Sequence, residues 1–250
     1  MSARFDGFNR ALGFHLNRLD HGRDFFRCLA GAFGELGGDG SVRAIVLAGE
    51  GPAFSAGHDL RELRGADASE YEEIFTQCVL LMETIENIPH PVIAEVGALA
   101  TAAGCQLVAA CDLAVASTQA RFATPGVRIG LFCSTPMVAL SRDIGRKRAL
   151  EMLLTGDPID AETARAWGLV NAVVAPDALR ATTLALAAKI GASSRTVVGL
   201  GKATFYRQLD LSQSEAYVFT KEVMVQNAQL DDAQEGIAAF IDKRVPQWPD

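Results

Sequence analysis

Three short apolar segments, each bounded by glycine or by charged residues, stand out along the chain as candidate buried strands. They are Arg43–Gly49, Pro91–Gly97 and Asp112–Ala116, and their interiors are rich in Val, Ile, Leu and Ala. Before and between them lie segments whose apolar residues recur at helical spacing. Strand, helix and strand in this order predict an α/β fold with crossover connections.

The helices of this half of the chain are predicted from the spacing of their apolar side chains. Asp24–Leu36 repeats large apolar residues every three or four positions, and the glycine pair that follows can end a helix. Ala102–Ala110 predicts a helix of small residues. Tyr71–Asn87 carries one apolar face, made of Ile74, Cys78, Leu81 and Ile85.

After Lys147 the pattern becomes mainly helical. The predicted helices are Arg146–Leu154, Ala161–Trp167, Pro176–Ile190, Arg195–Gln208, Gln213–Leu230 and Ala233–Lys243. In the fifth, one apolar stripe packs either on its own chain or on another subunit: Ala216, Phe219, Val223 and Leu230. We therefore expect a core over residues 1–190 that holds the ligand site, and a helical oligomerisation region over residues 191–250.

The composition is that of a globular protein, with 49% hydrophobic and 21% charged residues. A chain of 250 residues is long enough for a substantial core. Its 23 Lys and Arg stand against 30 Asp and Glu, so the formal net charge is −7. This acidic balance argues against a nucleic-acid-binding protein, which needs a basic surface to neutralise phosphates.

The cysteines and histidines show no spacing typical of metal ligands. There are five cysteines and four histidines, and the sequence contains no Cys-x-x-Cys motif. We expect no metal site and free, buried thiols, as in a reducing compartment.

No segment of the sequence predicts export or membrane insertion. The residues Met1–Gly7 lack the apolar core of a secretory signal. The longest uncharged run, Val96–Cys111, is shorter than the roughly 20 residues that cross a bilayer. We therefore expect a cytoplasmic protein without a membrane span.

Two segments of small residues could carry chemistry. Phe54–Leu60 follows a predicted strand, and Ala56 and Gly57 leave its backbone accessible, so the N–H of His58 could donate to a carbonyl oxygen. An ordinary turn would explain the same residues. Leu99–Gln106 leads into a helix, whose first N–H groups lack intrahelical partners and favour negative charge. Tight helix packing would also require small side chains there.

Together the two segments could form an oxyanion hole, in which two backbone N–H groups bind one carbonyl oxygen. Such a site stabilises an enolate or a tetrahedral anion, and each donor contributes roughly 3–4 kcal/mol to lowering the barrier.

Several motifs keep one order and spacing from about Leu16 to the C-terminus: Ala53–Leu60, Pro91–Ala94, Ala98–Ser117, Phe122–Gly126, Gly130-Leu131, Leu153–Ile159, Trp167–Asn171 and Phe240–Pro246. In these motifs the sequence resembles the enoyl-CoA hydratase/isomerase (crotonase) family. Within the family it is most similar to the subgroup described as enoyl-CoA hydratase domain-containing proteins. The residues before Leu16 depart from the family's first strands.

The resemblance implies a crotonase-type spiral of ββα turns, a C-terminal helical region that forms trimers, and acyl-CoA thioesters as ligands. It implies no cofactor, because coenzyme A is part of the substrate. It places the oxyanion donors at the backbone N–H groups of His58 and Ala103. The implied substrate-binding residues are Ala56, Gly57, Asp59, Leu60, Ala100, Gly104, Leu131, Cys133, Phe240 and Lys243, the last two holding coenzyme A, often that of a neighbouring subunit.

The two glutamates with which hydratases of this family hold and activate water are replaced by Gln106 and Gly126. Gln106 can position water but cannot take up a proton at neutral pH, and Gly126 offers only its backbone. We therefore expect a lyase of acyl-CoA metabolism in which enolate stabilisation survives and ordinary hydration is impaired. The expected assembly is a homotrimer or a dimer of trimers.

Two alternatives to a hydratase remain open. The segment Phe54–Asp59 also resembles the methylmalonyl-CoA decarboxylases of the family, in which the residue matching His58 helps to hold the carboxylate. Cys133, however, stands where those enzymes have Tyr. The other alternative is a non-catalytic acyl-CoA-binding or assembly protein. A reactive thiolate at Cys133 and a displaced carboxylate at Glu62 or Glu95 are further candidates.

Overall fold

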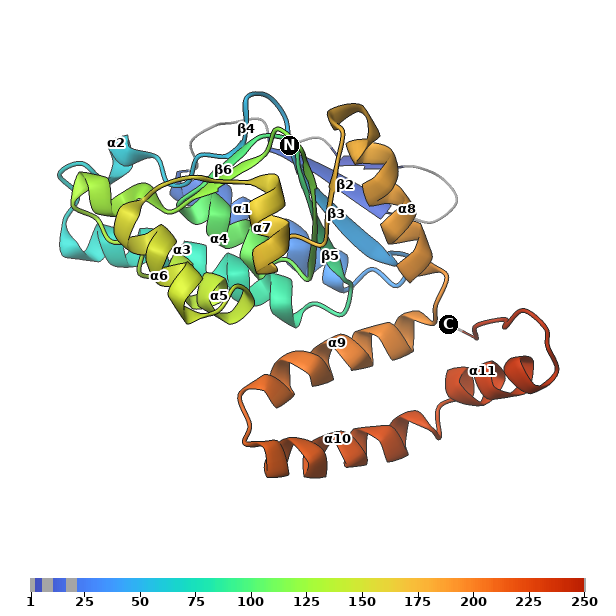
Figure 1. The fold of residues 1–250 in the computed structure, drawn as a ribbon. Coiled ribbons are helices and arrows are strands. Elements are labelled where there is room, and N and C mark those ends of the chain that lie inside the picture. The colour runs from blue at the N-terminus through green and yellow to red at the C-terminus, as the bar shows by residue number, and fades with distance from the viewer. Residues whose placement is uncertain (1–2, 6–10, 17–21, 250) are drawn as a thin grey trace.

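The computed structural model describes residues 3–5, 11–16 and 22–249, and its strands form two sheets (Figure 1). The larger sheet has the order β1-β2-β3-β5-β7-β10, and all neighbours are parallel except β1 and β2. Its strands are β1 (Ala3–Phe5), β2 (Ala11–Leu16), β3 (Ala44–Gly49), β5 (Val92–Val96), β7 (Leu113–Ser117) and β10 (Ala172–Val174).

The smaller sheet has the order β4-β6-β8-β9, with β9 antiparallel to β8. Its strands are β4 (Ala53–Ser55), β6 (Leu99–Thr101), β8 (Arg121–Ala123) and β9 (Ile159–Asp160). Two of these strands, β4 and β6, lead directly into the segments in which the sequence predicts chemistry.

The chain repeats a strand–strand–helix unit, in which each turn adds one strand to each sheet. The first turn is β3, β4 and then the helices α2 (Leu60–Leu63) and α3 (Ala68–Asn87). The second is β5, β6 and α4 (Ala103–Ala110). The third is β7 and β8, followed by η1 (Pro125–Ile129), α5 (Pro136–Asp143) and α6 (Arg146–Thr155). This repeat confirms the expected spiral of ββα turns.

Alternating side chains of the larger sheet build hydrophobic cores on its two faces. On β3, Ile45 and Leu47 pack with helices α1 (Arg23–Gly37), α3 and α4, whereas Ala44 and Val46 pack with α8 (Leu179–Gly191). Helices cover both faces of the sheet, so both sets of alternating side chains are apolar. This explains why the strands appear in the sequence as continuous apolar runs.

The predicted helices are present, with small shifts at their ends. α7 (Ala161–Trp167) has the predicted bounds, and the predicted Pro176–Ile190 divides into η2 (Pro176–Ala178) and α8. The structure adds α5, which the sequence pattern did not indicate. This helix has eight residues and buries only Pro136 and Leu140, so it lacks an apolar stripe long enough to recognise.

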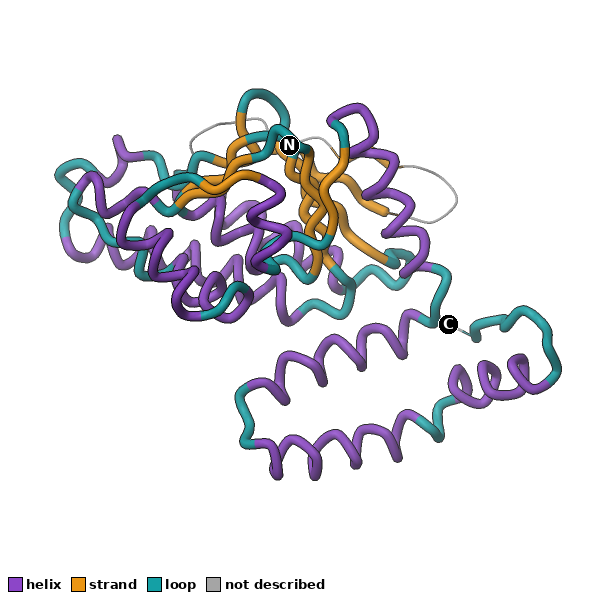
Figure 2. The backbone as a smooth tube through the Cα atoms, in the orientation of Figure 1, coloured by secondary structure: helices purple, strands orange, loops and turns teal. Residues whose placement is uncertain are grey.

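Helices α9 (Arg195–Leu209), α10 (Gln213–Asn227) and α11 (Asp231–Ile241) lie apart from the two sheets, below them in Figures 1 and 2. Phe219 of the predicted stripe of α10 faces its own chain, since the Arg207 guanidinium of α9 lies 4.4 Å from the centre of its ring. A second apolar face of α10 is exposed and consists of Tyr217, Val218, Met224 and Val225.

Among the residues that the structure describes, no helix combines the length and the apolar character needed to cross a membrane. The same residues contain no cluster of His, Cys, Asp and Glu able to hold a metal ion.

Candidate functional site

The loop after β4 lies directly against the start of α4. A Cβ atom placed on Gly57 would lie 3.0 Å from the Ala102 Cβ and 3.2 Å from the Ala103 nitrogen. A Cβ atom on Gly104 would lie 2.3 Å from the carbonyl oxygen of Ser55. Gly57 also has a φ of +87°, which favours glycine. These two glycines therefore allow the close approach that brings the backbone of His58 beside that of Ala103.

The start of α4 is stabilised by neighbouring strands rather than by a side-chain cap. Ala102 occupies the N-cap with a φ of 52° and donates its N–H to the Ala123 oxygen of β8, at 2.9 Å. The Gln106 N–H makes the first bond of the helix, to the oxygen of Ala102. The preceding N–H groups, including that of Ala103, have no acceptor within the helix.

Both segments open onto one cavity of about 510 Å³. The described residues that line it number eighteen; they come from the segments 56–63, 101–103 and 125–136 and from Phe75 of α3, and none of them is an acid. Seven of the predicted site residues lie in this lining: Ala56, His58, Leu60, Ala103, Gly126, Leu131 and Cys133.

The other predicted residues lie outside the cavity lining. Gly57, Ala100 and Gly104 are not part of the lining, and Asp59 caps α2 by accepting the Arg61 N–H. Phe240 is 86% exposed at the end of α11, and Lys243 follows that helix. Within this chain, the structure does not bring Phe240 and Lys243 to the cavity.

Gln106 does not face the cavity either. Its side chain is buried between α4 and α3, where its Oε1 lies 3.8 Å from the Cys78 thiol, which donates to it. The helical position alone predicts neither this orientation nor this partner.

Gly126 lies in the wall of the cavity, and the loop behind it is closely packed. The Leu131 N–H donates to the Gly126 oxygen at 2.9 Å. A Cβ atom on Gly126 would lie only 2.0 Å from the Leu131 oxygen and 2.8 Å from the Cys133 sulfur. The space at which a side chain of residue 126 would begin is therefore filled by Leu131 and Cys133.

The imidazole of His58 is packed between aromatic rings. Its centre lies 4.7 Å from that of Phe26 and 5.4 Å from that of Phe75. Within the described part of the chain, neither ring nitrogen has a hydrogen-bond partner, and both are covered. Burial lowers the pKa of His58 to about 4, so the ring is neutral at physiological pH. The structure therefore contradicts the interpretation of this segment as an ordinary turn with a solvent-facing histidine.

We expect His58→Leu to remove a pH-dependent part of the folding free energy. The pKa of His58 is about 4 in the folded chain, against 6.5 for a histidine in water, so the unfolded chain takes up the proton first as the pH falls. The stability that the neutral ring contributes is complete above about pH 6.5 and is lost as the pH falls toward about 4. Urea unfolding at about pH 7.5 and about pH 5 should therefore show a larger loss for the wild-type protein than for the variant. Equal losses would contradict this assignment.

The cysteines are free, and four of the five are buried. Cys28 is exposed, which corrects the expectation that all would be buried. Burial raises the pKa of the Cys78 and Cys105 thiols to about 12. Burial also raises the pKa of Cys133, against a smaller opposite effect of a hydrogen bond with the Gly126 backbone. Cys133 is thus a protonated thiol that lines the cavity, and a reactive thiolate is not supported.

Neither of the two candidate displaced carboxylates reaches the cavity. Glu95 pairs with Arg180, with an oxygen-to-nitrogen distance of 3.4 Å, and Glu62 belongs to α2 outside the lining. Several lining residues were not indicated by the sequence pattern. One of them is Phe75, which directly follows Ile74 of the apolar stripe of α3. Its position at the edge of this stripe was the only feature of the sequence that could have indicated it.

Comparison with known proteins identifies close relatives. The family model described as enoyl-CoA hydratase/isomerase matches residues 21–250. Enoyl-CoA hydratase domain-containing protein 3 of Xenopus laevis is 54% identical over 211 residues, which are 84% of this chain and 72% of that protein. The Homo sapiens protein of the same name is 53% identical over 208 residues, which are 83% of this chain and 69% of that protein.

Solved structures agree with these sequence matches. The crystal structure of an enoyl-CoA hydratase from Mycobacterium smegmatis has a TM-score of 0.96 and 47% identity, covering 100% of this chain and 98% of that one. The crystal structure of human enoyl-CoA hydratase domain-containing protein 3 has a TM-score of 0.92 and 46% identity, covering 99% of both chains. The fold class and the subgroup expected from the sequence are confirmed.

The relatives that are 50–54% identical are all named as mitochondrial. This finding contradicts the cytoplasmic location expected from the sequence. That expectation rested on the lack of a secretory signal, which bears on export and not on import into an organelle.

Proposed function

The chain belongs to the enoyl-CoA hydratase/isomerase family, and we propose that it binds an acyl-CoA thioester and stabilises the enolate derived from it. The thioester oxygen accepts hydrogen bonds from the backbone N–H groups of His58 and Ala103. The observation that carries this proposal is the contact between the His58 and Ala103 segments at the wall of a cavity of about 510 Å³.

The electrostatics of the cavity support binding of a developing negative charge. Helices α4 and α5 both begin at its wall, and helix N-termini favour anions. None of the lining residues is an acid that would oppose such a charge. These features favour an enolate over a neutral or cationic intermediate.

The same lack of acids favours decarboxylation as a second candidate reaction. Hydration needs groups that move protons to and from the substrate carbons, and no carboxylate stands among the described residues that line this cavity. In decarboxylation, the bond between Cα and the departing carboxylate breaks, and its electron pair forms the enolate without a base. Water then supplies the proton to Cα. His58 is an unsuitable anchor for the substrate carboxylate, because its ring is neutral and its nitrogens are covered.

A panel of CoA esters tests the proposed function. We expect butyryl-CoA to bind more tightly than free coenzyme A in calorimetry, and crotonyl-CoA to be hydrated slowly or not at all. Carbon dioxide release from malonyl-CoA or methylmalonyl-CoA would establish the decarboxylase. Binding without turnover on the whole panel would indicate an acyl-CoA-binding protein. The proposal fails if no CoA ester binds.

We further propose that the chain forms a homotrimer or a dimer of trimers, with Phe240 and Lys243 reaching the coenzyme A of a neighbouring subunit. The exposed face of α10 and the end of the chain support this assembly, since Ile241 is 70% exposed and Val245 is 82% exposed. Met224→Glu with Val225→Glu should shift sedimentation toward smaller species. A wild-type protein that sediments at 26.6 kDa, the mass of one chain, would contradict the assembly.

A further inference from the structure

The C-terminal arm, defined as residues 195–249, meets the rest of the chain mainly along α9. Figures 1 and 2 show α9 next to the α/β part of the molecule, with α10 on the far side of α9. Helix α9 buries only Gly199 and Lys202, and α10 buries no residue. A helix that packs on a core normally buries an apolar stripe. In α9, the buried residues are instead a glycine and a lysine.

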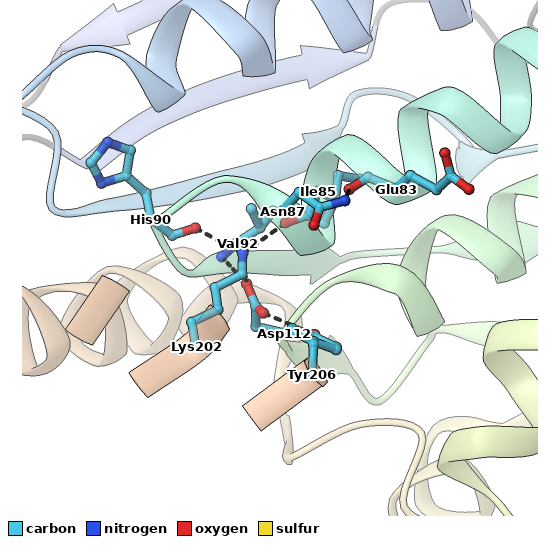
Figure 3. Close-up of polar contacts among 8 residues, drawn as sticks. All are labelled: Glu83, Ile85, Asn87, His90, Val92, Asp112, Lys202 and Tyr206. Carbon is cyan, nitrogen blue, oxygen red and sulfur yellow. Dashed lines mark hydrogen bonds and ion pairs between the residues drawn. The ribbon is translucent and has the colours of Figure 1, made fainter. Parts of the chain in front are cut away.

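The buried lysine is fully paired. The Lys202 ammonium donates to the carbonyl oxygens of Ile85 at 2.7 Å and His90 at 3.0 Å, and to Asp112 Oδ2 at 2.7 Å (Figure 3). The Tyr206 hydroxyl donates to Asp112 Oδ1 at 2.9 Å. All three protons of the ammonium and both carboxylate oxygens therefore have partners. We call Asp112, Lys202 and Tyr206 the polar lock.

The polar lock joins the arm to three parts of the core, namely the connection between α4 and β7, strand β5 and the last turn of α3. Asp112 lies between α4 and β7, and its Oδ2 also accepts the Val92 N–H of β5, at 2.7 Å. The carbonyl of Ile85 belongs to the last turn of α3, where a cation is favoured by the helix dipole. Close contact completes the junction, because a Cβ atom on Gly199 would lie 3.0 Å from the Pro89 Cβ.

Three further contacts hold α11 and the end of the chain in place, and none of them involves the core sheets. Ser194 Oγ donates to the buried Asp232 of α11, and the Trp248 Nε1 donates to the Ala192 oxygen at 2.8 Å. Arg244 and Glu235 form a two-point ion pair at 2.6 and 2.8 Å. These contacts tie α11 and the end of the chain to the short connection between α8 and α9.

We propose that the polar lock holds the C-terminal arm against the core, and that the arm separates as one unit when these contacts break, while the α/β core stays folded. The reason is the nature of the junction. Apolar burial resists opening whatever the charge state, but a buried ion pair becomes unfavourable as soon as one partner is lost. Burial already lowers the pKa of Lys202, and the adjacent Asp112 opposes this effect. The inference does not depend on the proposed function.

Hydrogen–deuterium exchange of the full-length protein tests this proposal. Lys202→Met keeps the length of the side chain and removes its charge. We expect exchange of the amides in α9 and α10 to accelerate by about tenfold or more, while the amides of β3 and β5 keep their wild-type rates. Adding Asp112→Asn should reverse part of the acceleration, because it removes the charge left without a partner. Lys221→Met, at an exposed lysine of α10, is the matched control and should change neither region.

Two results would overturn the inference. Equal acceleration in the arm and in β3 and β5 would mean that the polar lock stabilises the whole fold. Unchanged exchange in α9 and α10 would mean that it does not hold the arm. If Lys202→Met does not fold, Tyr206→Phe permits the same comparison, because it removes only the hydrogen bond to Asp112. Both regions are compared within one sample, so each serves as a reference for the other. Hydrogen exchange also requires neither a ligand nor turnover.

Discussion

Gly126→Glu is expected to destabilise the protein and to leave it without measurable hydratase activity. The Cβ atom of any side chain here would lie 2.0 Å from the Leu131 oxygen, far inside van der Waals contact. Because the obstacle is backbone, bound to Gly126 by its own hydrogen bond, relief requires movement of the loop. Overpacking typically costs about 1–3 kcal/mol, and a collision with backbone places this substitution toward the upper end of that range. Urea unfolding and a crotonyl-CoA hydration assay measure the two effects.

Gly31→Glu is the matched control for this substitution. Nothing lies within 4 Å of a Cβ atom on Gly31, which is in the exposed part of α1, so this glutamate should be tolerated. Adding Gln106→Glu should not rescue Gly126→Glu, since residue 106 is buried next to Cys78 and does not line the cavity. A folded Gly126→Glu protein that hydrates crotonyl-CoA much faster than the wild type would refute this account of the cavity wall.

Ala103→Pro is expected to abolish most of the polarisation of a bound thioester. Proline has no N–H, so it removes one of the two proposed donors, and loss of one such donor typically lowers turnover by about 10²–10³. The helix itself should persist, because Ala103 is the first residue of α4, where proline is well tolerated. The measurement is the red shift in the absorbance of a bound enoyl thioester, together with any turnover found on the ester panel.

Ala103→Gly keeps the N–H and provides the control for Ala103→Pro. It should leave the red shift close to that of the wild-type protein. If Ala103→Pro folds and gives the wild-type red shift, the Ala103 amide does not contact the thioester oxygen, and the proposed oxyanion hole is wrong.

The sequence predicts those helices and strands whose buried residues recur at a regular spacing along the chain. The stripe of Ile74, Cys78, Leu81 and Ile85 is buried throughout, and the three predicted strands lie in the larger sheet. The smaller sheet escaped prediction, because β4, β6, β8 and β9 are two or three residues long and show no period. Such strands form where the preceding turn of the spiral offers an open edge, which is a tertiary condition.

The candidate site divides in the same way. The backbone positions at His58 and Ala103 could be predicted, because small residues after a strand leave amides accessible whatever the neighbouring side chains are. Side-chain orientation could not be predicted. Gln106 turns toward Cys78 on another helix, and Phe75 reaches the cavity from the edge of a core stripe. Both depend on how α3 and α4 pack against each other, to which local sequence contributes little.

Because α4 is completely buried, the part of the cavity wall that it forms should tolerate few substitutions, whereas the exposed part of the lining should tolerate many. All eight residues of α4 are buried, and a methyl group added at Gly104 would collide with the Ser55 backbone. Elsewhere in the lining, Ile129 is 60% exposed and Leu131 is 43% exposed, so their side chains can change size without displacing the core. A library aimed at new ligand specificities should therefore vary the exposed residues Ile129, Leu131 and Phe132 and leave α4 and the buried Cys133 untouched. Sequence changes would then be confined to one part of the cavity lining, while the proposed oxyanion donors at the start of α4 keep their positions.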